Sequence, residues 1–88
     1  MIVRVSKTFL KDYNTISDAT FQEAFKKIFQ LLTGISHLDH SQIKKITGHD
    51  SAFRIGMGFY YIGLYQTSAD EVVLMRLVHR EQITAVFG

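Results

Sequence analysis

The spacing of hydrophobic residues changes once along this chain, and that change restricts the fold more than any other feature. Between residues 20 and 34 apolar side chains recur every three or four positions, which is the period of an amphipathic helix. Thr20 and Glu23 have the spacing of a capping box, and Gly34 is a typical helix stop. The segment therefore predicts a helix with one apolar face, formed by Phe21, Ala24, Phe25, Ile28, Leu31 and Leu32.

A shorter apolar stripe precedes this helix. Phe9, Leu10 and Tyr13 fall on one side of a helix of about two turns, and Ser6 stands at its N-cap position. The stripe is lost near residues 14–15, so we expect a turn at residues 16–18. The β-branched run at residues 1–5 predicts an opening strand, and a helical hairpin therefore follows this strand.

In the second half of the chain the apolar period falls to two, which indicates strands. The turns between them lie at residues 48–51, 58–59 and 67–70, and each is short enough to make neighbouring strands antiparallel. The predicted fold is α+β, with the opening strand and the helical hairpin packed on a mainly antiparallel sheet. The four strands are expected at residues 43–46, 53–57, 60–65 and 72–78.

Composition excludes several classes of protein. With 88 residues, the segment 1–88 is expected to be a single domain. The absence of cysteine excludes disulfides and thiolate metal sites, and fits a reducing cytosol. No apolar run approaches the ~18 residues that span a bilayer, so we expect an unprocessed, soluble, cytoplasmic protein with no membrane contact. The net charge of +2 is too small to indicate nucleic-acid binding by itself, so that function depends on where the charges lie.

Alternation within the strands assigns side chains to the two faces of the sheet. In residues 53–57 the odd positions are apolar, which places Arg54 and Gly56 on the face away from the helices. In residues 60–65 the same reasoning places Tyr61, Gly63 and Tyr65 beside Arg54. The helix-covered core is expected to receive Phe53, Ile55, Met57, Tyr60, Ile62 and Leu64.

The last strand is apolar at both parities, so hydrophobicity alone does not orient it. Because an unpaired buried guanidinium is costly, Arg76 and Arg80 are placed on the open face of the sheet, the face away from the helices. This orientation directs His79 to the other side, as a residue at the edge of the core. In this orientation of the last strand, the core would receive Val73, Met75 and Leu77, and the open face would receive Val72, Leu74 and Val78.

The open face then combines arginines with tyrosines, a combination suited to single-stranded RNA. Guanidinium groups bind phosphate bidentately, and phenol rings offer stacking surfaces to bases. For cleavage by attack of the 2′-hydroxyl, arginine supplies only charge stabilisation, so proton transfer would fall to histidine, tyrosine or lysine. The alternative is that these arginines are solvated surface charges and the tyrosines are packing residues.

Other polar groups give weaker indications. His37, Asp39 and His40 are crowded, but loop residues do not fix a tetrahedral metal geometry, so no metal or other cofactor is expected. The strand glycines do not open a helix, which makes them hairpin or close-approach residues rather than a phosphate loop.

Two segments carry a resemblance to a known family. Residues 53–64 read FRIGMGFYYIGL, and residues 70–83 read DEVVLMRLVHREQI. With the preceding Ile43-Lys44-Lys45-Ile46-Thr47-Gly48, their order and spacing resemble the RelE/ParE toxin superfamily over the whole chain. That family has a lysine-rich strand ending in glycine, an arginine-bearing strand, and a closing strand ending in His-Arg.

The resemblance implies a cytoplasmic toxin of a type II toxin–antitoxin system, held inactive in a hetero-oligomer by a cognate antitoxin. RelE-type members cleave mRNA at the ribosome without a metal, whereas ParE-type members inhibit DNA gyrase. Carried over by position, Arg54 and Arg80 become the catalytic cations, and Tyr61 completes the expected catalytic set. The expected RNA-binding residues are Lys44, Lys45, Tyr65 and Arg76.

Three positions depart from the family pattern. Gly56 stands where many members have a second basic residue, Tyr61 replaces an arginine, and Thr84 occupies the place of a closing tyrosine. The leading interpretation is a RelE-type mRNA interferase that inhibits translation. The alternative is a ParE-like gyrase inhibitor, or a toxin without catalysis that acts by binding protein.

Overall fold

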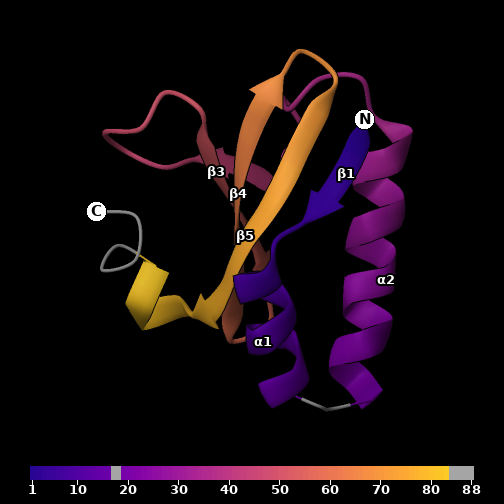
Figure 1. The fold of residues 1–88 in the computed structure, drawn as a ribbon, viewed down its shortest axis with the longest axis vertical. Helices are drawn as coiled ribbons and strands as arrows, with labels where there is room; N and C mark the ends of the chain where they lie inside the picture. The colour runs from indigo at the N-terminus through magenta and orange to yellow at the C-terminus, as the bar shows by residue number, and fades with distance from the viewer. Residues whose placement is uncertain (17–18, 84–88) are drawn as a thin grey trace.

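The computed structural model describes residues 1–16 and 19–83 and has the predicted α+β architecture (Figure 1). Five strands form one mixed sheet in the order β1-β5-β4-β3-β2, antiparallel except for the parallel pair β1 and β5. None of the helices within the described residues has the length and apolarity needed to cross a membrane. The elements are β1 (Ile2–Val5), α1 (Lys7–Thr15), α2 (Ala19–Gly34), β2 (Ile43–Lys45), β3 (Ala52–Met57), β4 (Tyr60–Ser68), β5 (Glu71–His79) and a 3-10 helix, η1 (Arg80–Gln82).

Local signals account for most element boundaries. The Ser6 hydroxyl accepts a hydrogen bond from the Phe9 amide at 3.0 Å, which confirms it as the N-cap of α1. Gly58, with φ of 63°, opens the two-residue turn between β3 and β4, and this backbone conformation is one that glycine adopts without strain. Thr20 lies inside the first turn of α2 rather than at its cap, and residues 17–18 of the predicted turn lie outside the described residues.

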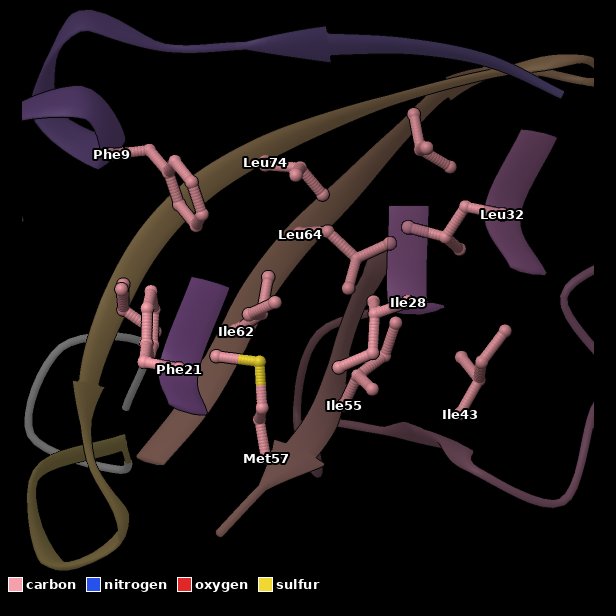
Figure 2. Close-up of a cluster of buried hydrophobic side chains, with 12 residues drawn as sticks. Phe9, Phe21, Ile28, Leu32, Ile43, Ile55, Met57, Ile62, Leu64 and Leu74 are labelled. Carbon is pink, nitrogen blue, oxygen red and sulfur yellow. The ribbon is translucent and has the colours of Figure 1, made fainter. Parts of the chain in front are cut away.

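The main core lies between the two helices and one face of the sheet (Figure 2). Phe9 of α1 and Leu32 of α2 are almost fully buried against strand residues such as Leu64. The predicted faces of β3 and β4 are confirmed, because their expected core residues all belong to this cluster or pack against it. Burying a side chain of this size stabilises the fold by about 1.5–3 kcal/mol. We call the opposite side of the sheet, which bears Arg54 and Tyr61, the open face.

The predicted orientation of β5 is wrong for its first half. Gly63 of β4 pairs with Arg76, but the next residue, Leu64, pairs with Leu74, so Met75 is a bulge without a partner. One extra residue reverses the alternation of side chains. Val72 and Leu74 therefore enter the main core, whereas Met75 packs on the open face. Beyond the bulge the prediction holds, since Leu77 is in the core and Val78 is on the open face.

Candidate functional site

Three side chains from different elements meet on the open face. Arg54 of β3 and Arg80 of η1 both lie over the ring of Tyr61 in β4, with their Cζ atoms 4.7 and 4.8 Å from its centroid. We call these three residues the arginine–tyrosine cluster. A contact of this kind stabilises an exposed guanidinium by about 0.5–1 kcal/mol and holds it in place. All three predicted catalytic residues are therefore neighbours in space.

The hairpin turn holds the Arg80 side chain. Its Nε donates a hydrogen bond to the Gly58 carbonyl oxygen at 2.8 Å, and its backbone amide donates to the Phe59 carbonyl at 2.9 Å. One terminal nitrogen of the guanidinium lies beside Gly56, 3.0 Å from where a Cβ would be, which confirms the prediction that this glycine marks a close approach.

Two hollows flank the cluster and share its residues as walls. One has a volume of ≈ 300 Å³ and is completed by Gln42, Lys44 and Gly56. The other, of ≈ 340 Å³, is completed by Lys45, Ile46, Thr47 and Ile83. The first is polar and cationic, and the second includes two apolar residues. A nucleic-acid strand lying across the cluster would place its backbone near both guanidiniums.

The charges of the cluster are not neutralised within the part of the chain that the structure describes. The ion pairs found there join Arg4 to Glu71 and Arg76 to Asp12, each at 2.8 Å, and neither involves Arg54 or Arg80. A hydrogen bond from Arg4 lowers the pKa of Glu71, and the same contact raises the pKa of Arg4. This pair lies at the β1 edge of the sheet, away from the cluster on β3 and β4. Two adjacent, unpaired guanidiniums favour an anionic ligand.

The four predicted RNA-binding residues have different surroundings. Lys44 pairs directly with Arg54 across β2 and β3, so it shares the open face and extends the cationic surface. Lys45 pairs with Phe53, which packs against the main core, although Lys45 also borders the second hollow. Tyr65 packs against the small apolar cluster of the open face, formed by Ile46, Ala52, Val78 and Ile83.

Arg76 differs from the other predicted RNA-binding residues because its guanidinium forms an ion pair. Its Nε donates to the Asp12 carboxylate of α1 at 2.8 Å, and the Leu77 amide donates to the same oxygen at 2.9 Å. β1 pairs with β5 only as far as Val5 and Leu74. Beyond that point β1 no longer covers the edge of β5, and the Asp12 carboxylate accepts the hydrogen bond from the Leu77 amide of β5. This arrangement assigns Arg76 to the attachment of α1 and leaves it outside the cluster.

His79 lies on the opposite side from Arg80, as predicted. Its ring contacts Tyr60, with the ring centroids 5.9 Å apart, and its Nδ1 accepts a long hydrogen bond of 3.4 Å from the Glu81 amide. Thr84 lies outside the described residues. Sequence reasoning missed Gln42 and the Gly58 carbonyl. A polar residue two positions before Lys44 was a signal for Gln42, whereas no side-chain pattern indicates a backbone acceptor.

Comparisons with known proteins bear on the fold and the family. No protein-family model matches the chain. The curated protein Toxin RelE3 of Methanocaldococcus jannaschii is 30% identical over 89 aligned residues, which cover 99% of each chain. The toxin in the crystal structure of a RelB-RelE antitoxin-toxin complex from Methanococcus jannaschii superposes with a TM-score of 0.77 at 29% identity, covering 97% of this chain and 99% of that one. A copper-bound mutant toxin from Helicobacter pylori shares the fold, with a TM-score of 0.64 at 17% identity over 94% of this chain and 98% of that one.

Proposed function

Because the chain belongs to the RelE family and is a toxin of a RelE-type toxin–antitoxin system, we propose that it cleaves mRNA at the ribosome and thereby stops translation. The observation that carries this proposal is the arginine–tyrosine cluster. Two guanidiniums without an acidic partner among the described residues converge on one phenol ring, on a face that also bears Lys44. Such a surface complements the phosphodiester backbone of single-stranded RNA.

The proposed reaction is attack of a ribose 2′-hydroxyl on the adjacent phosphorus atom. The 2′-oxygen gives its proton to a water molecule and bonds to phosphorus, so that a 2′,3′-cyclic phosphate forms. The bond from phosphorus to the 5′-oxygen of the next nucleotide breaks, and that oxygen leaves with a proton. Negative charge grows on the phosphoryl oxygens during this step. Arg54 and Arg80 are proposed to bind those oxygens, a role that requires fixed donors and no proton transfer.

Tyr61 is proposed to act through its hydroxyl. Because both guanidiniums lie over its ring, less of the ring is left for stacking on a base. The hydroxyl can donate a proton or a hydrogen bond to the leaving 5′-oxygen beside the two cations. Lys44, opposite Arg54, is proposed to bind the neighbouring phosphate.

The proposal includes a protein partner. The solved relative is an antitoxin-toxin complex, and we extend this to a cognate antitoxin that binds this chain in the cytoplasm and blocks its action until released. An extended or helical segment with acidic residues would complement the open face.

The test is cleavage of a ribosome-bound message by the purified chain, with mapping of the new 5′ ends. Arg54→Ala and Arg80→Ala are each expected to reduce cleavage about 100- to 1000-fold, since each removes one donor from the charge that develops at phosphorus. Arg4→Ala removes the same charge from the edge strand β1, away from the cluster, and this variant is expected to cleave normally.

Two results would refute the assignment. Undiminished cleavage by both cluster variants would show that the site is elsewhere. An unmodified chain that leaves messages intact but causes DNA breaks in cells would transfer the function to gyrase inhibition.

A further inference from the structure

The position of Arg80 depends on a gap at Gly56. Arg80 follows β5, and its backbone pairs with Phe59 in the turn, whereas Arg54 lies farther along β3. To reach Tyr61 beside Arg54, the Arg80 side chain crosses the end of the hairpin. The Gly58 carbonyl fixes its Nε there, and one terminal nitrogen then lies over Gly56.

A methyl group at position 56 would occupy the same space. A Cβ there would be 3.0 Å from the Arg80 terminal nitrogen and 3.3 Å from Cε1 of Tyr61, both tighter than ordinary contacts. The backbone does not require glycine at this position, because positive φ angles among the described glycines occur only at Gly48 and Gly58. Glycine in a strand interior is unfavourable by itself, so its presence here points to the close approach of another group.

We infer that Gly56 is a positioning residue for the Arg80 guanidinium. The expected effect on catalysis rests on the proposed function. The effect of Gly56 on the position of the Arg80 guanidinium does not depend on that function. The missing side chain lets the cation settle against Tyr61 next to Arg54, so that both guanidiniums face the same hollow. A Cβ at this position makes the Arg80 terminal nitrogen give way by a few tenths of an ångström, and larger side chains displace the guanidinium farther from the Gly58 carbonyl and from Arg54.

The structural content is tested by NMR on the isotope-labelled full chain, through the arginine Nε–H signals. Within residues 1–16 and 19–83, three such groups donate hydrogen bonds: Arg80 to the Gly58 carbonyl, Arg4 to Glu71 and Arg76 to Asp12. Gly56→Ala is expected to shift the Arg80 signal toward that of a solvent-exposed arginine, because the guanidinium must give way to the new methyl group, and to leave the other two signals in place. The matched control is Gly34→Ala, because a Cβ at that residue meets nothing within 4 Å. An unchanged Arg80 signal in Gly56→Ala would overturn the inference.

A double variant covers the case in which Gly56→Ala disturbs the sheet. In an Arg80→Ala background the nearest contact of the new methyl group is gone. The Arg4 and Arg76 signals are compared between Arg80→Ala and the double variant. The inference requires that these signals are the same in both. If the double variant is as disturbed as Gly56→Ala alone, the glycine serves the strand and not the arginine.

Cleavage gives the functional result. Gly56→Ala is expected to lower ribosome-dependent cleavage about 10- to 100-fold, less than outright removal of a donor. It is expected to add nothing in the Arg80→Ala background, because residues that act through one group are not additive. Independent, additive losses would overturn the positioning role. If the unmodified chain cleaves no RNA, the proposed function fails, while the NMR signals still decide the role of Gly56.

Discussion

The four arginines of this chain fall into two pairs with opposite surroundings. Arg4 and Arg76 are on the β1 and β5 side of the sheet, and each meets a carboxylate at 2.8 Å. Arg54 and Arg80 are on the β3 and β4 side, where both contact Tyr61 and no ion pair engages them within the described residues. The first pair joins elements of the fold to one another. The charge of the second pair is left for a ligand, although the Arg80 Nε already donates to the Gly58 carbonyl.

The difference lies in the neighbouring residues and not in the arginines themselves. Asp12 reaches Arg76 from α1 because the helix takes over the edge of β5 after β1 ends. The arginine–tyrosine cluster instead has Lys44 beside it and Gly56 beneath it. A single carboxylate near the cluster would pair with its arginines and make them structural, like Arg4 and Arg76.

The largest effect is expected from placing such a carboxylate beside Arg54. Lys44→Glu puts an acid directly opposite Arg54 across β2 and β3, where the two can pair. Cleavage of ribosome-bound mRNA should fall about 100- to 1000-fold, as for the loss of a donor, while thermal stability stays the same or rises slightly. Lys27→Glu makes the same charge change on the exposed side of α2, which covers the other face of the sheet, and is the matched control. Equal losses for the two variants would mean that net charge, and not pairing of Arg54, determines activity.

The next effect separates the ring of Tyr61 from its hydroxyl. Tyr61→Phe keeps the surface under both guanidiniums and removes only the proposed proton donor. Cleavage should fall about 100-fold, at the lower end of the contribution of an acid catalyst, with affinity for RNA unchanged. Tyr13→Phe, on α1 and packed against the main core, should cleave normally. Full activity of Tyr61→Phe would limit Tyr61 to holding the two arginines.

Sequence reasoning was most successful where a residue pattern has a single interpretation. Alternation in β3 and β4 placed Arg54 and Tyr61 on one face, and the order of strands then brought Arg80 to them. The half of β5 before Met75 was oriented wrongly because both of its faces are apolar. A bulge there costs no hydrophobic burial, so the sequence contains no pattern that would indicate it.

Long-range pairings were the other limit. Asp12 and Arg76 are 64 residues apart, and nothing in either local sequence indicates that they meet. Arg76 was grouped with the RNA-binding residues because an outward arginine without a visible partner belongs on the open face. Gly56 was interpreted as a lost cation and as a close-approach glycine, but the sequence did not indicate that the approaching group is the guanidinium of Arg80. In both cases the neighbour comes from a distant part of the sequence.

A smaller effect, on stability alone, is expected at the paired side. Asp12→Ala leaves the Leu77 amide and Arg76 without their acceptor, since Asp12 accepts from both. The free energy of unfolding should fall by about 1–3 kcal/mol in urea titrations, the cost of an unsatisfied donor. Asp12→Asn keeps an oxygen for the Leu77 amide and should lose less. Cleavage per folded molecule should stay unchanged, and a loss comparable to that of Arg54→Ala would contradict the division into two pairs.

The smallest effect concerns the exposed pair of Arg4 and Glu71. Hydrogen bonds from Arg4 and from Thr67 lower the pKa of Glu71 in the folded chain. A carboxylate whose folded pKa is depressed stabilises the fold above its unfolded pKa, and this contribution disappears as the pH falls through the folded value. The melting temperature of the unmodified chain should therefore exceed that of Glu71→Gln near neutral pH, and the two should converge in acid. Added salt should reduce the difference as well, because both groups are in contact with solvent. Melts that differ equally at all pH values would mean that Glu71 acts through its shape and its bond to Thr67, and the paired side would then owe its stability to Asp12 rather than to both carboxylates.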